Sequence, residues 1–263
     1  MILLLDIGNT NINIAVADDI AAGDKIIAKW RVSTIHNRTA DEYIALLTQL
    51  MSNQKIEPSD IKDVAISSVV PPIMMHINKM CLSLFGVAAK QVGAELKANI
   101  KVKTDKPSEV GADRIVNAVG VAKIYGTPAI VVDFGTATTF DIVDKNGDYC
   151  GGVISPGVNL SLHALHEFAA RLPSVPVERT AKVIGTNTRD AMQSGVYWGY
   201  IGLIEGLLVR IKTEMGGTPI VVATGGLAPL FAEGTTAIEH IDADLTIVGL
   251  LEIYRSQNLI QRR

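Results

Sequence analysis

The feature that most constrains this sequence is a short pattern that occurs twice, half a chain apart. The stretches MILLLDIGNTNINIAVADD (1–19) and AIVVDFGTATTFDIVDKNGD (129–148) each run from apolar residues into Asp-x-Gly, small polar residues and a second extended run. Asp6 aligns with Asp133 and Gly8 with Gly135, at an offset of 133 − 6 = 127, close to half of the 263 residues. Asn9-Thr10-Asn11 then aligns with Thr136-Ala137-Thr138. Each copy predicts a strand, a tight turn and a returning strand.

The remainder of each half supports a duplication. Residues 63–72 (DVAISSVVPP) and 219–229 (PIVVATGGLAP) both predict a buried strand that ends in small residues and a turn. Residues 40–51 and 113–125 place their apolar side chains near one face, as amphipathic helices do. We therefore expect an α/β fold of two duplicated lobes whose sheets are covered by helices.

The boundary between the lobes is expected near residues 116–128, where a helix should end at Gly126-Thr127-Pro128. This predicts an N-terminal lobe of residues 1–120 and a C-terminal lobe of residues 121–263, with a cleft between them. The second half carries about thirty extra residues, which indicates an insertion near 153–195. Long insertions in compact folds usually serve function or form an interface.

Composition excludes several classes of protein. The chain is 48% hydrophobic and 19% charged, has a net charge of −3, and contains no cluster of Lys and Arg, which argues against a nucleic-acid partner. The apolar run 196–211 contains Glu205 and three glycines, so it predicts a buried helix and no membrane span. The N-terminal apolar run stops at Asp6 and lacks the features of a signal peptide. Cys81 and Cys150 predict two free thiols and a cytoplasmic location.

The repeated turns indicate a chemistry. Small residues after each aspartate leave backbone N–H groups open to phosphate oxygens. A carboxylate beside phosphate needs a cation or a cation-bound water between them, so Asp6 and Asp133 predict a nucleotide–metal site. A plain hairpin turn explains one copy, whereas two copies at half-chain spacing favour the nucleotide interpretation. The patterns GxGxxG after a strand and GxxxxGK[ST] are absent, which argues against Rossmann and Walker-type sites.

Asp113 and Arg114 leave two interpretations open. Asp113 stands where a helix should begin, so it is either an N-cap or a carboxylate that faces a substrate hydroxyl. Arg114 offers a planar guanidinium to a carboxylate or a phosphate.

Six motifs follow one another along the chain: DIGNTN (6–11), EVGADRIVNAV (109–119), VVDFGTATTFD (131–141), PGV (156–158), GTNTRDAMQSG (185–195) and ATGGLAPL (223–230). Through these motifs, which have the same order in that family, the sequence resembles type III pantothenate kinases over nearly its whole length. The family belongs to the sugar kinase/actin/Hsp70-like ATPase superfamily, whose members have two duplicated ribonuclease-H-like lobes.

The resemblance implies the reaction of ATP with pantothenate to give ADP and 4′-phosphopantothenate, the first step toward coenzyme A. Asp113 would be the catalytic base. The first phosphate turn would consist of Asp6, Ile7, Gly8, Asn9, Thr10, Asn11, Ile12 and Asn13, and Thr136 in the second turn would contact ATP. Gly111, Ala112, Asp113, Arg114 and Thr188 would bind pantothenate. Asp133 would hold a monovalent cation, potassium or ammonium, Mg²⁺ would lie near Asp6, and the protein would be a homodimer.

One departure from the family pattern stands just before the Gly-Ala-Asp-Arg loop. Many members carry Tyr-Asp-Asn-Pro there, whereas this chain has Thr104-Asp105-Lys106-Pro107, so the contact of that tyrosine with pantothenate does not transfer. Two alternatives to the pantothenate kinase stay open: a non-enzymatic transcriptional accessory homologue, and a kinase of the same superfamily that acts on another hydroxyl. Intact Asp6, Asp113, Arg114 and Asp133 favour an enzyme, because buried charges are costly to keep without a function.

Overall fold

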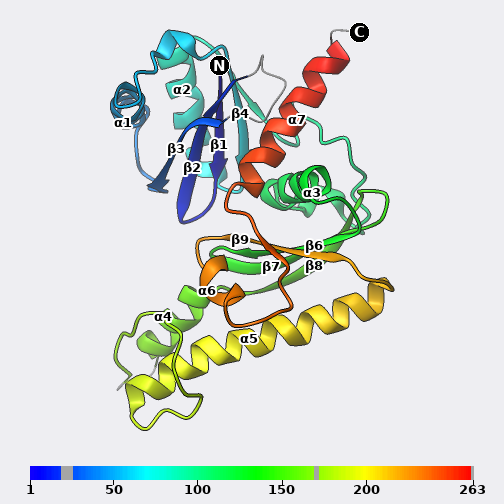
Figure 1. The fold of residues 1–263 in the computed structure, drawn as a ribbon. Helices are drawn as coiled ribbons and strands as arrows, with labels where there is room; N and C mark the ends of the chain where they lie inside the picture. The colour runs from blue at the N-terminus through cyan, green and yellow to red at the C-terminus, as the bar shows by residue number, and fades with distance from the viewer. Residues whose placement is uncertain (19–25, 169–171, 262–263) are drawn as a thin grey trace. The chain divides into compact units, whose positions relative to one another are not determined.

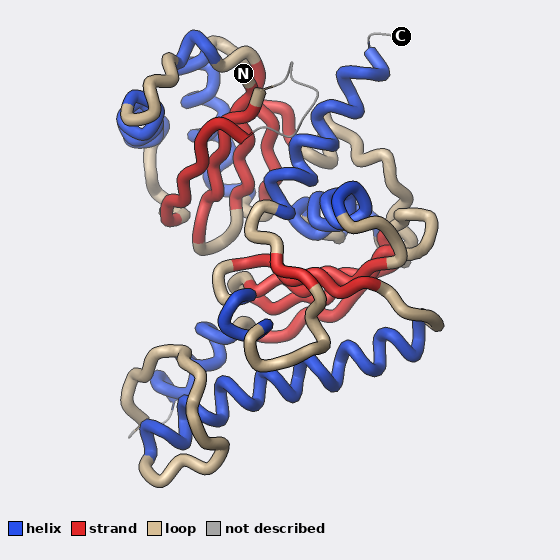
Figure 2. The backbone as a smooth tube through the Cα atoms, in the orientation of Figure 1, coloured by secondary structure: helices blue, strands red, loops and turns tan. Residues whose placement is uncertain are grey.

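The computed structural model describes residues 1–18, 26–168 and 172–261, and these divide into two compact units. Unit 1 comprises residues 1–101, 105–123 and 245–263, and unit 2 comprises residues 102–104 and 124–244. Residues 169–171, in the expected insertion, lie outside the described residues. Figure 1 labels the elements, and Figure 2 distinguishes the strands of each sheet from the helices that pack on it.

The elements of unit 1 are the strands β1 (Ile2–Ile7), β2 (Asn11–Ala17), β3 (Ile26–Ser33), β4 (Asp63–Ser68) and β5 (Ala89–Gln91), and the helices α1 (Ala40–Ser52), α2 (Met74–Phe85), α3 (Ala112–Ile124) and α7 (Leu245–Gln261). Those of unit 2 are the strands β6 (Ala129–Phe134), β7 (Ala137–Val143), β8 (Tyr149–Pro156), β9 (Ile220–Gly225) and β10 (His240–Ile241), and the helices α4 (Val158–Phe168), α5 (Thr188–Met215) and α6 (Ala228–Ala232).

The two sheets have the same topology, which confirms the predicted duplication. The first has the order β3-β2-β1-β4-β5 and the second the order β8-β7-β6-β9-β10. In each, the first three strands form an antiparallel meander, and the fourth and fifth strands run parallel to the first. The order hairpin, strand, helix, strand expected for each lobe includes the third strands, β3 and β8, but only the first, second and fourth strands were assigned to residues from the sequence.

Alternation along β1 sorts its side chains between two sets of helices. Leu3, Leu5 and Ile7 belong to the apolar cluster that contains α1 and α2. Ile2 and Leu4 belong to the cluster that contains α3 and α7. Because side chains of a strand point alternately to opposite faces, Asp6 lies on the face that α3 and α7 cover.

Helix α7 packs against α3 through two glycines of unit 1. A Cβ on Gly249 would lie 2.0 Å from the carbonyl oxygen of Val116, and one on Gly120 would lie 2.5 Å from that of Leu245. The hydroxyl of Thr246 also donates to Asn117 Oδ1 at 2.7 Å. This close crossing explains why residues 245–263 group with unit 1, whereas the sequence assigned residues 121–263 to a single lobe.

In unit 2, helix α5 covers one face of the second sheet. Its residues Tyr197, Ile201 and Ile204 share an apolar cluster with Ile130 and Val132 of β6. The predicted buried helix at 196–211 is thus the central part of α5.

Two smaller expectations can be compared with the described residues. None of the helices in the described ranges combines the length and the hydrophobicity that a membrane crossing requires. Cys81 and Cys150 are both free thiols, as predicted; Cys81 is buried and Cys150 is exposed.

Candidate active site

Asp6 occupies the end of β1, where three strands of the first sheet place polar side chains side by side. It pairs in register with Asn13 of β2 and with Ser67 of β4. The Asn13 amide donates to Asp6 Oδ2 at 3.1 Å. Asp6 is only 9% exposed and Ser67 is fully buried. The Ser67 hydroxyl has no hydrogen-bond partner of ordinary geometry among the described residues, so it remains available to a ligand or to a cation-bound water.

The surroundings of Asp6 change its acidity. Burial raises the pKa of Asp6 to about 6, because the charged carboxylate loses its hydration. The hydrogen bond from Asn13 opposes this increase, the charge of Asp113 adds to it, and Ser67 lowers the pKa slightly. A nearby cation would stabilise the charged form of such a buried carboxylate.

Asp113 reaches the same region because α3 covers the face of the sheet on which Asp6 lies. The helix begins at Ala112, so Asp113 lies in its first turn and not at the capping position that the sequence left open. Asp113 Oδ1 accepts a hydrogen bond from the backbone N–H of Arg114 at 2.8 Å. Burial raises the pKa of Asp113, and the N–H and the positive charge of Arg114 partly oppose that increase.

Gly111 leaves the space that the Asp113 carboxylate occupies. A Cβ at residue 111 would lie 2.6 Å from Asp113 Oδ1 and 3.4 Å from Val69 Cγ1. A larger residue at position 111 would therefore displace the Asp113 carboxylate from its place at the start of α3. The Gly-Ala-Asp-Arg motif thus combines a small residue for access, a helix start and two charged side chains.

The first turn is fixed at both ends by hydrogen bonds. The Gly8 N–H donates to the Asn11 carbonyl at 3.0 Å, and the Thr34 hydroxyl donates to the Gly8 carbonyl at 2.6 Å. The Thr34 N–H donates to the Thr10 carbonyl at 2.9 Å. Asn9 and Thr10, at the tip, are exposed. The tip is therefore a pre-formed loop whose backbone is accessible to an anion.

The second turn repeats this arrangement in unit 2 with one residue fewer. Asp133 of β6 pairs in register with Thr139 of β7 and with Thr224 of β9, as Asp6 does with Asn13 and Ser67. The offset from Asn13 to Thr139 is 139 − 13 = 126, whereas that from Asp6 to Asp133 is 127. The alignment of Asn9-Thr10-Asn11 with Thr136-Ala137-Thr138 is therefore wrong by one residue at its end, because the second hairpin loop is shorter.

Two glycines pack against the backbone of this second turn. A Cβ on Gly157 would lie 2.1 Å from the Thr136 carbonyl oxygen, to which the Gly157 N–H donates at 3.1 Å. Gly225 has a φ of +91°, and its Cβ would lie 2.6 Å from the Phe134 carbonyl oxygen. These contacts explain the Pro-Gly-Val and Thr-Gly-Gly motifs: the start of α4 and the end of β9 both approach the turn through backbone alone.

Thr188 is the first residue of α5 and is exposed. Asn187 caps the helix, and its Oδ1 accepts from the Asp190 N–H at 2.9 Å. Thr188 lies on a different element from Asp133 and Thr136, although all three belong to unit 2.

The structure thus groups the predicted residues by unit. Residues 6–13 and 111–114 lie in unit 1, where the charge of Asp113 adds to the increase that burial causes in the pKa of Asp6. Asp133 and Thr136 share one hairpin of unit 2. Sequence reasoning missed Ser67, Thr139, Thr224 and Gly157, and the small residues that end the fourth strand of each lobe were the signal for two of them. Within the described residues, no group of three or more His, Cys, Asp and Glu side chains is arranged to hold a metal ion.

Comparison with known proteins decides the family. A family model described as type III pantothenate kinase matches residues 2–210. The chain belongs to the type III pantothenate kinase family.

Curated members of this family resemble the chain throughout its length. The type III pantothenate kinase of Paramagnetospirillum magneticum is 53% identical over 256 residues and covers 97% of both chains. That of Caulobacter vibrioides is 49% identical over 263 residues and covers 99% of both. The chain therefore spans the length of the type III pantothenate kinases that it matches.

Solved structures support the fold of this pantothenate kinase family member at lower identity. A Baf family protein from Campylobacter jejuni superposes with a TM-score of 0.63 at 20% identity, and covers 98% of this chain and 99% of its own. An activator of 2-hydroxyisocaproyl-CoA dehydratase from Clostridium difficile, solved with bound ADPNP, superposes with a TM-score of 0.55 at 17% identity, and covers 98% and 97%.

Proposed function

We propose that this chain is an ATP-dependent pantothenate kinase that converts pantothenate to 4′-phosphopantothenate, the first step of coenzyme A biosynthesis. Relatives that are about half identical over nearly the whole chain carry this name. The observation that carries the proposal is the pair of carboxylates in unit 1, the buried Asp6 and the half-buried Asp113: burial raises the pKa of Asp6, and the charge of Asp113 adds to that increase. Keeping two like charges in a poorly hydrated place is costly and is typical of catalytic sites.

Asp113 is the proposed base for the acceptor hydroxyl. Its raised pKa makes it a better proton acceptor than an ordinary aspartate. Phosphoryl transfer depends mainly on positioning and on charge neutralisation, so Asp113 would orient the primary hydroxyl of pantothenate and accept its proton. Arg114 would bind the carboxylate of pantothenate, while Gly111 and Ala112 leave room for its chain.

The two Asp-Gly turns are the proposed phosphate-binding elements. Residues 6–13 in unit 1 and Thr136 in unit 2 would bind ATP through backbone N–H groups and small polar side chains. The oxygen atoms around Asp6, including the Ser67 hydroxyl, fit a hydrated Mg²⁺, and Asp133 with its threonine neighbours fits a potassium or ammonium ion. When bound, these cations would offset negative charge on the phosphates.

A coupled assay of ADP release tests the proposal. ADP formation should require pantothenate, should proceed in potassium and should fall strongly in sodium; mass spectrometry should identify phosphopantothenate. ADP release that does not depend on pantothenate would contradict the function. Equal rates in potassium and sodium would contradict the assignment of a monovalent cation to Asp133.

A non-enzymatic transcriptional accessory role has less support. The Baf family neighbour is described as a transcriptional activator, but at 20% identity it shows the fold alone. The net charge of −3 and the intact acidic pair give no reason to prefer a nucleic-acid partner. Another hydroxyl substrate would be recognised in the same assay by ADP release with that alcohol and not with pantothenate.

The proposal includes a homodimer in which Thr188 contacts pantothenate. Ile154 of β8 and Leu160, Leu165 and Phe168 of α4 are 42–87% exposed. Beside them, a cavity of about 430 Å³ lies at Leu165 and Tyr200, between α4 and α5. Exposed apolar side chains in such number are typical of protein interfaces, and a second copy of this chain would cover them.

Light scattering coupled to size exclusion tests the dimer. The wild-type chain should elute with the mass of a dimer, and Leu165→Glu should shift it toward the monomer. Val209→Glu, which changes an exposed apolar residue of α5 outside this set, is the matched control. A monomeric wild type would contradict the dimer without affecting the assignment of the reaction.

A further inference from the structure

A three-residue segment of the chain leaves unit 1, pairs with the edge of the second sheet and returns. Residues 102–104 belong to unit 2, although residues 1–101 and 105–123 belong to unit 1. Val102 forms a parallel bridge with Tyr149 at the start of β8, and the Lys103 N–H donates to the Tyr149 carbonyl at 2.8 Å. The segment therefore extends the sheet beyond its edge strand.

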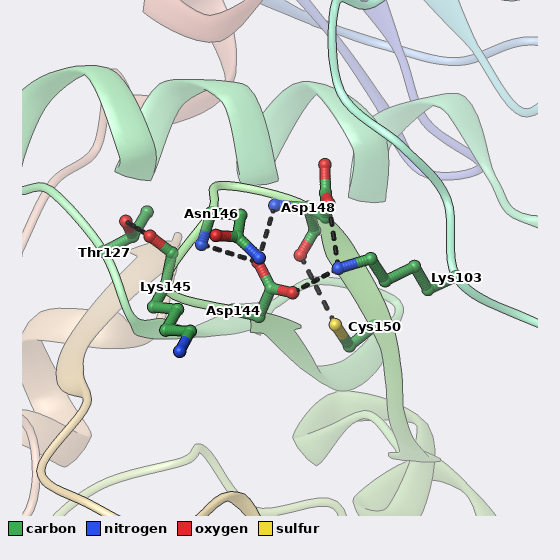
Figure 3. A network of polar contacts seen from close by, with 7 residues as sticks. All are labelled: Lys103, Thr127, Asp144, Lys145, Asn146, Asp148 and Cys150. Carbon is green, nitrogen blue, oxygen red and sulfur yellow. Dashed lines mark hydrogen bonds and ion pairs between the residues drawn. The ribbon is translucent and has the colours of Figure 1, made fainter.

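The Lys103 ammonium group is held by two carboxylates of the β7–β8 turn (Figure 3). Its Nζ lies 2.5 Å from Asp144 Oδ2 and 2.8 Å from Asp148 Oδ2. Both carboxylates are mostly buried, with 25% and 13% of their side chains exposed, whereas Lys103 is 41% exposed. One cation between two anions makes a stronger and more directional contact than a single surface ion pair.

The turn itself also orients the Asp144 carboxylate. Asp144 Oδ1 accepts the backbone N–H groups of Asn146 at 2.8 Å and of Asp148 at 3.0 Å (Figure 3). Gly147, with a φ of +81°, closes the turn by donating to the Asp144 carbonyl at 2.9 Å. Burial alone would raise the pKa of Asp144, but the hydrogen bonds from Lys103 and from the turn lower it to about 2. The acidic turn is therefore charged and pre-formed at any physiological pH.

A second set of contacts runs from the same point of β8 to the hairpin of β6 and β7. The hydroxyl of Tyr149, whose carbonyl receives the Lys103 N–H, donates to Asp141 Oδ1 at 3.1 Å. Thr139 donates to Asp141 Oδ2 at 3.0 Å, and Thr139 pairs in register with Asp133. Asp141 is fully buried, so these hydrogen bonds compensate a costly charge and fix Tyr149 firmly. Lys103 is thus attached to a rigid part of unit 2.

The segment after Lys103 leads directly into the Gly-Ala-Asp-Arg motif. Thr104 packs beside Gly151, whose Cβ position would lie 3.8 Å from Thr104 Cγ2. Only six residues, 105–110, separate Thr104 from Gly111, and they include a short 3₁₀ turn at Pro107–Glu109. The Lys103 contacts therefore restrict the starting point of the segment that ends in Gly111, Ala112, Asp113 and Arg114.

We propose that Lys103, clamped by Asp144 and Asp148, is a positioning residue for the acceptor substrate. The clamp holds residues 102–104 on β8 and so reduces the conformational freedom of the segment that presents Gly111 and Arg114. This inference rests on the proposed function, and it assigns a role to three charged residues that the reaction itself does not use. Loss of the clamp should weaken acceptor binding because the segment would have to be ordered when the acceptor binds.

The test compares Lys103→Met with Lys212→Met in the full-length protein. Lys212 makes one long ion pair, 3.8 Å from Glu239, in the same unit and is the matched control. In Lys103→Met we expect the KM for pantothenate to rise about tenfold, while kcat and the KM for ATP change less than about twofold. Asp148→Asn should shift KM in the same direction, and Lys103→Arg should restore most of the affinity.

Hydrogen exchange gives a readout that does not depend on activity. The backbone amide of residue 103 should exchange about tenfold faster in Lys103→Met than in the wild type, because its hydrogen bond to the Tyr149 carbonyl would open more often. Faster exchange with an unchanged KM for pantothenate would overturn the positioning role, as would a uniform fall in kcat. If the wild type is active, the variants test the positioning role alone. A wild type without pantothenate kinase activity would overturn the proposed function and this inference together. If Lys103→Met does not fold, Asp148→Asn and Lys103→Arg still decide the outcome.

Discussion

Burial raises the pKa of Asp6, at the end of β1, and the charge of Asp113, at the start of α3, adds to that increase although 106 intervening residues separate the two aspartates in the chain. The two aspartates come close because of the geometry of a β-strand. Alternation places Asp6 on the side of the sheet that carries Ile2 and Leu4, and α3 covers that side. One of two aspartates that are candidates for separate reasons, Asp113, therefore affects the acidity of the other, Asp6.

The pH dependence of stability should reveal the raised pKa of Asp6. An acid whose pKa is higher in the folded state binds its proton more tightly there, so the folded state loses stability as pH rises from about 4 to about 6. Asp6→Asn removes this loss and should gain about 2–3 kcal/mol relative to the wild type between pH 4 and pH 7. Urea unfolding at both pH values measures the difference. An advantage that is constant with pH would show that Asp6 titrates normally.

Replacing Asp113 with Asn should remove most turnover while ATP binding persists. We expect kcat to fall about 10²–10⁴-fold, because the amide cannot take the proton from the hydroxyl of pantothenate. Calorimetric titration with ATP should give nearly the wild-type affinity. Asp41→Asn, in the first turn of α1 and exposed, is the matched control for the loss of a helix-terminal charge. Near-normal turnover in Asp113→Asn would leave a structural role at the start of α3 as the better explanation.

Gly157→Ala should disturb the second turn. Its Cβ would lie 2.1 Å from the Thr136 carbonyl oxygen, so the turn or the start of α4 must move, at a cost of about 3 kcal/mol. The KM for ATP should rise as well. Gly202→Ala, in α5, is the control: its Cβ meets no atom within 4 Å and should stabilise the helix by up to about 1 kcal/mol. Equal stability of the two variants would argue against the close packing at Gly157.

Gly249→Ala should loosen the crossing of α7 and α3. The added Cβ would lie 2.0 Å from the Val116 carbonyl oxygen, so the helices must separate, at a cost of about 3 kcal/mol. Because α3 carries Asp113 at its start, kcat should decrease together with stability. Denaturant unfolding and steady-state kinetics on one preparation measure both. A variant that is destabilised but has the wild-type kcat would show that α7 does not help to position Asp113.

The features that could be predicted from the sequence are those that depend on local patterns of residues. The Asp-Gly turns, the helix at 113–125 and the strand that ends in small residues each depend on a short run of residues, and the duplication is visible in their repetition. The position of Asp113 relative to a capping residue depended on a single residue of helix boundary, which sequence patterns do not resolve.

The features that escaped prediction depend on contacts between distant residues. Nothing local in residues 245–261 indicates that Gly249 fits against Val116. The contact of Lys103 with the acidic turn Asp144-Lys145-Asn146-Gly147-Asp148 also escaped prediction, because it depends on a bridge between Val102 and Tyr149. The second hairpin loop is one residue shorter than the first, and only the strand register shows this difference.

The crossing of α7 and α3 also sets an order of events during protein synthesis. Unit 2 lies within residues 102–244, so all of it is synthesised before residues 245–261. The face of the first sheet that carries Ile2, Leu4 and Asp6 lacks α7 until then. A nascent chain that pauses near residue 244 would therefore expose this apolar face to chaperones and proteases, and would lack the helix that packs against α3.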